Sequence, residues 1–313
     1  RLPSIARKTP IHSYRCNIHP LFRRQKSRLT WFFPFRKGPI PETVYSITLR
    51  LEKRVHYVDD PSSKDTRRIL CDKMKGMRDL LFWGVLPFLL PQALYVRRFA
   101  PRFAPASGPS QGSSGEGKQT RLLAVGDSII AGVGATKLSN ALVGQTAAAL
   151  STALDCRVSW QALGVSGYNS TKVLNQLVPK LPDVAADYII VSVGVNDVTG
   201  LTTLQKWRQN LSLLLDKLQA HSPNAAIAVA GLPPLHEFPL LPQPLRATFG
   251  MRARALDGVV RKVVEKRPNS VHMPVDFEPS PQKFAPDGYH PSEEGYAEFG
   301  QYMADGLLRV TRQ

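Results

Sequence analysis

The sequence has few cysteines and no pattern of cysteine and histidine that would bind a metal ion. Its three cysteines, Cys16, Cys71 and Cys156, are scattered along 313 residues. Neither a disulfide framework nor a cysteine-based zinc site is therefore expected. The seven histidines show no HExxH-type spacing. We expect the protein to work without a metal and without another cofactor.

Lys and Arg far outnumber Asp and Glu in the first part of the chain, which accounts for most of the formal net charge of +17. Residues 1–79 hold 19 Lys and Arg against 7 Asp and Glu, whereas residues 120–313 hold 18 against 16. Basicity is thus a property of the N-terminal region. The sequence also lacks a zinc-finger or RNA-recognition signature, so nucleic acid is not an expected partner of the main domain.

Residues 1–73 lack the periodicity of a folded domain. Their aromatic and basic residues follow neither a helical nor a strand period for long. The first methionines are Met74 and Met77. Our hypothesis is that the functional product starts near one of them, and that 1–73 is an upstream extension or a disordered tail. The alternative is a basic arm that contacts a membrane or nucleic acid.

Long apolar runs are also lacking, with one exception at residues 80–96. A helix of these 17 residues would span ~26 Å, slightly less than a hydrocarbon core of about 30 Å, and its prolines would kink it. It could be a cleaved signal peptide, an uncleaved anchor or a helix in the membrane interface. A buried amphipathic helix, which would let the protein extract without detergent, is the fourth possibility.

Arginines directly after this run, within the segment 74–102, oppose translocation of the downstream domain. We therefore favour a membrane anchor or surface helix, with the downstream domain on the cytoplasmic side. A secreted or periplasmic location is the alternative. No pattern in the sequence predicts an oligomeric state.

Residues 103–119 are rich in Gly, Ser, Pro and Ala and have no periodicity, which predicts a flexible linker. From residue 120 onward, short apolar strands alternate with longer helices. This pattern is typical of an α/β domain whose parallel sheet is covered on both faces. Five strands are predicted at 121–126, 157–163, 187–193, 225–231 and 270–275, and helices at 139–153, 170–180, 202–221, 245–266 and 292–310.

Chemically useful groups follow the ends of these strands. Ser128, in Gly126-Asp127-Ser128 after the first strand, is the candidate nucleophile, because open α/β sheets place their ligands at the carboxyl ends of strands. A strand followed by Gly-Asp-Ser is also typical of an ordinary turn with a helix cap. Three further blocks follow, namely Gly164-Val165-Ser166-Gly167, Gly194-Val195-Asn196-Asp197 and Asp287-Gly288-Tyr289-His290.

The four blocks in this order resemble the SGNH, or GDSL-type, esterase and lipase superfamily over about residues 120–313. The resemblance implies a flavodoxin-like, three-layer αβα fold with a five-stranded parallel sheet. It also implies Ser128 as the nucleophile, His290 as the base and Asp287 as the acid partner. The implied oxyanion hole consists of the N–H groups of Ser128 and Gly167 and the side chain of Asn196. The esterases of this superfamily need no metal.

Physical chemistry supports these roles separately. A serine hydroxyl needs a neutral imidazole to take its proton, and the imidazole needs an acceptor for its other nitrogen. Asp287 and His290 can provide both from one short loop. The amide of Asn196 can donate to an oxyanion, whereas an ionised Asp197 cannot, so we give Asp197 a supporting role.

Each block also has a purely structural explanation, as a turn, a helix cap or a surface histidine. Rival nucleophiles are Ser166, Ser170 and Ser192, and His236 is a rival base without an Asp three residues earlier. We interpret Asp127 as a residue that orients the turn.

These observations predict a serine hydrolase that cleaves carboxylic esters, from small molecules or lipids, through an acyl-serine intermediate. An acyltransferase or thioesterase that uses the same site is one alternative, and a non-catalytic, membrane-tethered binding domain is another. The long, proline-rich stretch 231–250 follows the fourth strand at the same edge of the sheet. We expect Leu235, Phe238, Leu240 and Leu241 to line an acyl or alcohol pocket, unless they simply cover the core.

Overall fold

The computed structural model describes residues 82–275 and 280–311, apart from 83, 86, 97 and 100–102. All of them belong to the second of two units of the chain, Asp60–Gln313. The predicted N-terminal extension, residues 1–73, lies outside the described residues, as do parts of the segment 74–102.

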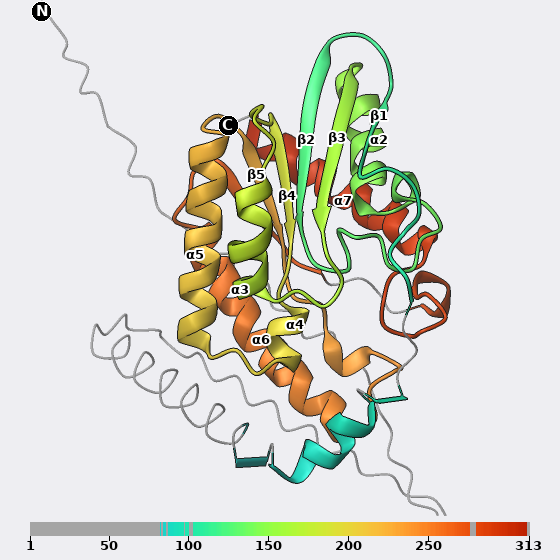
Figure 1. Ribbon diagram of the computed structural model, residues 1–313, viewed down its shortest axis with the longest axis vertical. Coiled ribbons are helices and arrows are strands. Elements are labelled where there is room, and N and C mark those ends of the chain that lie inside the picture. The colour runs from blue at the N-terminus through green and yellow to red at the C-terminus, as the bar shows by residue number, and fades with distance from the viewer. Residues whose placement is uncertain are drawn as a thin grey trace, which may run out of the picture. The chain divides into compact units, whose positions relative to one another are not determined.

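A six-stranded sheet with the order β1-β3-β2-β4-β5-β6 runs through the domain (Figure 1). Strands β2 to β6 are parallel, and β1 pairs antiparallel with β3 at the edge. The order of the parallel strands is that of a flavodoxin-like sheet. The strands are β1 (Gln111–Ser114), β2 (Gln119–Gly126), β3 (Arg157–Gly164), β4 (Tyr188–Ser192), β5 (Ala226–Ala230) and β6 (Ser270–Met273).

Helices cover both faces of the sheet, which confirms the predicted three-layer αβα fold (Figure 1). On one face lie α3 (Ser170–Lys172), α5 (Leu204–His221) and α6 (Leu245–Val264), and on the other lie α2 (Leu142–Leu154) and α7 (Glu293–Thr311). Every residue of β4 and of β5 is buried. Such strands are apolar throughout because helices exclude water from both of their faces.

Short helical turns lie between these elements. They are η1 (Leu138–Asn140), η2 (Val173–Leu177), η3 (Val178–Lys180), α4 (Val195–Thr199), η4 (Leu235–Glu237) and η5 (Pro281–Lys283). The single helix predicted at 170–180 is thus divided into α3, η2 and η3. A proline at the start of η3 contributes to this break because it has no N–H to continue the helical hydrogen bonds.

The sixth strand, β1, corrects the predicted count of five and lies inside the predicted linker 103–119. An edge strand can form through backbone hydrogen bonds alone, without a pattern of apolar side chains. A strand prediction based on apolar residues therefore does not detect it. Gly112 fits here because a Cβ atom would lie 2.4 Å from the Trp160 ring. Upstream, the Ser107 N–H donates to the Thr136 carbonyl at 3.0 Å, so the segment follows the surface of the domain.

A further helix precedes the sheet, and its described residues are 82, 84, 85, 87–96, 98 and 99. We call it the N-terminal helix, and it is drawn in cyan near one end of α6 in Figure 1. Among the described residues, no helix combines the length and the hydropathy required to cross a bilayer.

Candidate active site

Three of the four sequence blocks meet at the carboxyl edge of the sheet because the strands that precede them end together. Gly126, at the end of β2, is in register with Gly164 on β3 and with Ser192 on β4. Beyond the strands, the Asp127 N–H donates to the Ser192 carbonyl at 3.0 Å, and the Val165 N–H donates to the Gly126 carbonyl at 3.3 Å. The loops that follow β2, β3 and β4 therefore start side by side.

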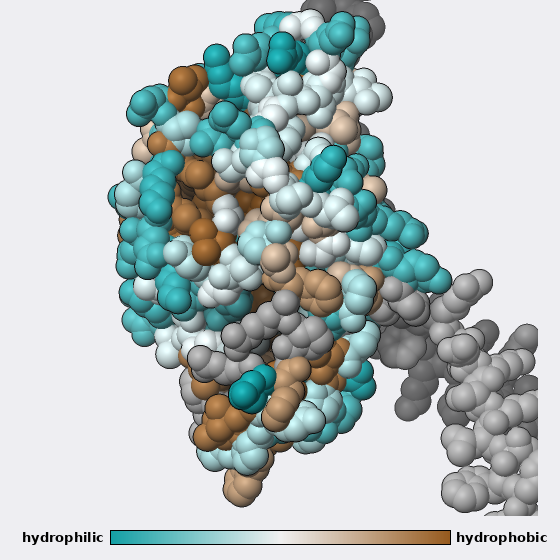
Figure 2. All heavy atoms as spheres, turned by 45° about the vertical axis from the view of Figure 1, so that its right-hand side comes forward, coloured by the Kyte–Doolittle hydropathy of each residue, from teal (hydrophilic) through white to brown (hydrophobic). Residues whose placement is uncertain are grey.

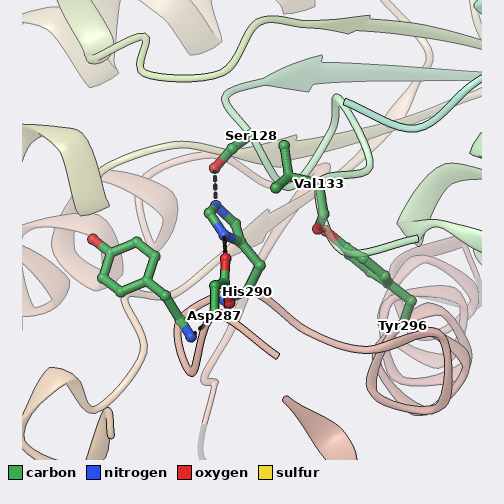
Figure 3. Close-up of polar contacts among 6 residues, drawn as sticks. Ser128, Val133, Asp287, His290 and Tyr296 are labelled. Atoms are coloured by element: carbon green, nitrogen blue, oxygen red, sulfur yellow. Dashed lines mark hydrogen bonds and ion pairs between the residues drawn. The ribbon is translucent and has the colours of Figure 1, made fainter. Parts of the chain in front are cut away.

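The fourth block, before α7, brings an imidazole to the serine of the first block. The Ser128 Oγ atom lies 2.9 Å from Nε2 of His290, and Nδ1 of His290 lies 2.6 Å from Oδ2 of Asp287. Figure 3 shows the His290 ring between the other two side chains. Side chains 162 positions apart in sequence are thus joined in one line of hydrogen bonds.

Hydrogen bonds from the His290 ring and from two backbone N–H groups stabilise the charged form of Asp287. Its Oδ1 atom accepts hydrogen bonds from the N–H groups of Tyr289 and His290, each at 2.9 Å. Burial raises the pKa of Asp287, but these bonds and the bond from the His290 ring outweigh burial and hold the pKa below its usual value. Because a carboxylate can only accept a hydrogen bond, the contact with Asp287 assigns a proton to Nδ1 of His290, and in the neutral imidazole Nε2 is then an acceptor.

Helix α7 holds the turn that carries Ser128. The Val133 N–H donates to the Ser128 carbonyl at 3.0 Å, and the Tyr296 hydroxyl donates to the Val133 carbonyl at 2.7 Å (Figure 3). Glu293, the first residue of α7, accepts from the N–H and the hydroxyl of Thr136 at 2.8 and 2.6 Å. Since α7 begins three residues after His290, one rigid helix positions both the serine turn and the imidazole.

Sequence reasoning missed Tyr296 and Glu293. Tyr296 has the spacing of any buried residue on an amphipathic helix, and Glu293 looks like an ordinary acidic residue in the first turn of a helix. Their contacts are with residues more than 150 positions away, so no local signal could have identified them.

Three N–H donors lie in the loops beside Ser128. The Asn196 amide donates to the Tyr168 carbonyl at 3.0 Å and lies 3.5 Å from a carboxyl oxygen of Asp127. Gly167 is exposed and has a φ of +81°, and a Cβ atom there would meet nothing within 4 Å. Within the described part of the chain, the backbone N–H groups of Ser128 and Gly167 have no acceptor. They are therefore available to an oxygen atom of a ligand.

A buried network ties the loop after β3 to the start of α4. Asp197 is fully buried and accepts from the N–H and the hydroxyl of Ser170 at 2.8 and 2.6 Å. The Asn210 amide on α5 donates to the same hydroxyl at 2.9 Å. Burial raises the pKa of Asp197, and the bonds from Ser170 oppose this rise. The network fixes Gly167 relative to Asn196 and engages the hydroxyl of Ser170, one of the rival nucleophiles.

Asp127 is a second buried carboxyl group next to Ser128, and it is only 2% exposed. Desolvation by burial raises its pKa to about 7, although the Ile129 N–H bond and the nearby His290 act in the opposite direction. The Ile129 N–H donates to it at 3.1 Å, as expected for a residue that orients the turn.

An apolar cavity adjoins Ser128 and His290. Its walls include Val193, Leu232, Phe238, Phe284 and Tyr289, with the ion pair between Lys283 and Glu298 (2.7 Å) at its border. The rings of Phe238 and Tyr289 meet edge to face, with their centroids 5.3 Å apart.

Of the four residues predicted to line a pocket, only Phe238 contributes to this cavity wall. Leu235 and Leu241 are buried in the core with α5 and α6, and the Leu240 N–H donates to the Gly288 carbonyl at 3.3 Å. Leu235 is the buried residue of the short helix η4, so its side chain packs in the core instead of facing the cavity.

The rival base, His236, contacts other residues than the candidate nucleophile. His236 lies 3.1 Å from the Arg254 guanidinium and 3.4 Å from a carboxyl oxygen of Glu237. In the part of the chain that the structure describes, no three His, Cys, Asp or Glu side chains gather as a metal site would require.

Solved structures share this fold. The structure is similar to the family 3 carbohydrate esterase of Clostridium thermocellum, with 18% identity and a TM-score of 0.50, over 62% of this chain and 98% of that chain. The psychrotrophic esterase EstA from Pseudoalteromonas sp. is also similar, with 18% identity and a TM-score of 0.49, over 62% and 100% of the two chains. Among curated proteins there is no match.

The family model of the GDSL-like Lipase/Acylhydrolase family matches residues 124–298. The chain belongs to this family, which confirms the resemblance inferred from the four sequence blocks. It is therefore a hydrolase that acts on ester bonds.

Proposed function

We propose that this hydrolase cleaves carboxylic esters through an acyl-serine intermediate, with Ser128 as the nucleophile, His290 as the general base and Asp287 as its acid partner. The observation that carries the proposal is the line of two hydrogen bonds, 2.9 Å from Ser128 to His290 and 2.6 Å from His290 to Asp287. Hydrogen-bond contact from nucleophile to base and from base to a carboxylate is the arrangement that activates a serine.

The reaction has two halves. Oγ of Ser128 attacks the ester carbonyl carbon while Nε2 of His290 takes the hydroxyl proton, and Asp287 stabilises the imidazolium. The tetrahedral intermediate collapses, and the alcohol leaves with the proton from His290. A water molecule then attacks the acyl-serine as His290 accepts its proton. The second intermediate collapses, His290 returns the proton to Oγ of Ser128, and the carboxylic acid leaves.

The negative oxygen of each intermediate needs N–H donors. In our proposal these are the backbone N–H groups of Ser128 and Gly167, which have no acceptor within the described residues, and the side chain of Asn196. One N–H of the Asn196 amide is held by the Tyr168 carbonyl at 3.0 Å. That bond orients the amide. The amide's second contact, with a carboxyl oxygen of Asp127, is long at 3.5 Å. In our proposal the oxyanion takes the place of this weak contact, and such a donor is worth about 3 kcal/mol.

The cavity beside Ser128 supports an ester with an apolar group. Its walls are mainly aliphatic and aromatic, and two of its charged residues, Lys283 and Glu298, are paired with each other. Such a surface favours an acyl chain or an apolar alcohol, because it offers few polar groups to replace the hydration of a sugar. Small-molecule esters and lipid esters both meet this requirement.

The proposal is tested by replacing the nucleophile. We expect Ser128→Ala to lower the rate of p-nitrophenyl ester hydrolysis by at least about 10³-fold and to abolish labelling by a fluorophosphonate probe. Ser166→Ala removes an exposed serine from the neighbouring loop and is the matched control, which should retain both signals. Unchanged labelling of the folded Ser128→Ala variant would refute the assignment.

The cavity assignment is tested with esters of increasing chain length. Phe238→Ala enlarges the cavity, so we expect the preferred acyl chain to become longer. Leu235→Ala also removes a buried side chain from the same segment, but one that does not line the cavity. It should destabilise the fold without changing the preferred chain length, and equal profiles for the two variants would argue against the cavity as the acyl site.

A further inference from the structure

The N-terminal helix packs on the hydrolase domain through one face. Phe82 and Leu89 on this face are 2% and 6% exposed and belong to the core shared with α5 and α6. Ala93 and Val96 pack against the same core. The steps of seven, four and three residues place these side chains on one side of a helix.

Polar contacts fix the same face to the beginning of α6. The Gln92 side chain donates to the Gln243 carbonyl at 2.8 Å and accepts from the Leu245 N–H at 3.1 Å. The Arg252 guanidinium lies 5.0 Å from the centre of the Phe82 ring. A helix that left the domain to cross a membrane would lose all of these contacts.

The remaining faces of the helix are exposed and apolar. Phe88 is 83% exposed, and Tyr95 and Phe99 are each 64% exposed, with their ring centroids 4.7 Å apart. Leu90 and Leu94 add to this surface. Among the described residues, seven of the ten exposed large hydrophobic side chains lie between residues 85 and 103. The lower end of the molecule in Figure 2, where Figure 1 places the helix, carries hydrophobic side chains.

The charged residues within this segment of the sequence have one sign. Between residues 80 and 103 the sequence contains Arg97, Arg98 and Arg102 and no acidic residue. Arg98 is exposed, and its guanidinium lies 5.6 Å from the centre of the Phe99 ring. Aromatic and leucine side chains beside arginines are the composition with which a helix enters the interface of an anionic bilayer.

We propose that the N-terminal helix docks this hydrolase on the surface of an anionic lipid bilayer. The helix lies in the plane of the interface. Its face with Phe82, Leu89 and Gln92 stays on the domain, while Phe88, Tyr95 and Phe99 enter the boundary between headgroups and acyl chains. Arg98 contacts lipid phosphates.

Docking in this way brings the bilayer close to one wall of the cavity. The helix contacts residues 243–245 of the segment 231–250. The same segment contributes Pro233, Pro234, Glu237 and Phe238 to the cavity wall. An ester in the membrane would therefore have a short path to the site. The binding itself does not depend on the proposed catalytic residues.

The test is sedimentation of the full chain with phosphatidylcholine vesicles that contain about 30% phosphatidylglycerol, and with vesicles of phosphatidylcholine alone. We expect the wild type to bind the anionic vesicles more tightly. The variant Phe88→Glu/Tyr95→Glu/Phe99→Glu should lower the partition coefficient by about 100-fold or more. The variant no longer buries three aromatic side chains in the bilayer, and the binding free energy lost in this way is larger than a 100-fold change requires.

The matched control is Leu213→Glu, which places a charge at a 45% exposed leucine on α5. It should bind like the wild type, and both variants should hydrolyse a soluble short-chain ester at the wild-type rate. If the triple variant loses that activity, Phe88→Ser alone takes its place, with an expected loss of about tenfold. The proposal would be overturned if the variant with the substituted helix still bound the vesicles like the wild type. It would also be overturned if Leu213→Glu weakened vesicle binding as much as the substitutions in the helix do. A wild-type dimer that the triple variant dissociates, without vesicle binding, would overturn it in favour of self-association.

Discussion

The turn after β2 and the loop before α7 each place a buried aspartate near His290, yet the two carboxyl groups have opposite properties. Asp127 and Asp287 are 2% and 4% exposed. Burial raises the pKa of Asp127 to about 7, whereas the pKa of Asp287 lies below its usual value. Burial alone therefore does not decide the charge of a carboxyl group in this site.

Hydrogen-bond donors make the difference. Asp287 accepts from two backbone N–H groups and from the His290 ring, all within 2.9 Å. Asp127 accepts from the Ile129 N–H at 3.1 Å and lies 3.5 Å from the Asn196 amide. Bonds to a carboxylate stabilise its charged form, and the loop before α7 provides more of them. As a result, the charged form is favoured at Asp287 and disfavoured at Asp127.

The largest expected effect separates the two aspartates by activity. Asp287→Asn should lower kcat/KM for a p-nitrophenyl ester by about 10³- to 10⁴-fold, because a neutral amide no longer holds the imidazole in the required tautomer or stabilises its charge. Asp127→Asn keeps a neutral group in the turn and should lower kcat/KM by less than about tenfold.

Asp305→Asn, an exposed substitution on α7, controls for the loss of a charge near the C-terminus. Equal losses in the variants at 287 and 127 would contradict the distinction between the two carboxyl groups.

Stability as a function of pH separates the aspartates further. The pKa of Asp127 rises on folding from 3.8 to about 7, so the unfolded chain loses this proton first. Its contribution to the free energy of unfolding should therefore fall as pH rises between about 4 and 7, on the order of 1 kcal/mol per pH unit. The contribution of Asp287 has the opposite sign: it is present above the unfolded pKa and is lost as pH falls through the lower folded pKa.

Urea unfolding of the wild type and of Asp127→Asn at about pH 5 and about pH 7 measures this difference. The variant should gain stability relative to the wild type as the pH rises. A difference that stays constant across this range would show that Asp127 does not titrate as its burial requires.

The smallest expected effect concerns the helix that connects the two regions. Tyr296→Phe removes the hydrogen bond of 2.7 Å from the tyrosine hydroxyl to the Val133 carbonyl. The N–H of Val133 donates to the Ser128 carbonyl, so this bond supports the serine turn. We expect a loss of about 1 kcal/mol in the free energy of unfolding. We also expect a several-fold lower kcat with little change in KM, because the serine turn is held less firmly.

Tyr188→Phe, at the buried start of β4, is the control and should leave kcat unchanged. If Tyr296→Phe costs stability but leaves kcat at the wild-type value, the tyrosine only packs the core and does not position the serine.

Much of the fold could be predicted because its signals are local. The five parallel strands appear in the sequence as short apolar runs, and the structure places each within two residues of its predicted limits. The exception is β1, which pairs through its backbone and leaves no apolar pattern. Helix α4 was also missed, because its five residues are too few to show a helical period.

The sequence by itself determined which chemical groups this protein carries and that each follows a strand or precedes a helix, because turn residues and apolar periodicity act over a few neighbouring positions. Only the tertiary structure decided that Ser128 lies 2.9 Å from His290, that Tyr296 holds the serine turn, and that Phe238 rather than Leu235 faces the cavity. It also decided that burial raises the pKa of Asp127 to about 7, whereas hydrogen bonds lower the pKa of Asp287. These properties depend on burial and on donors that come from distant parts of the chain, and no local pattern records them.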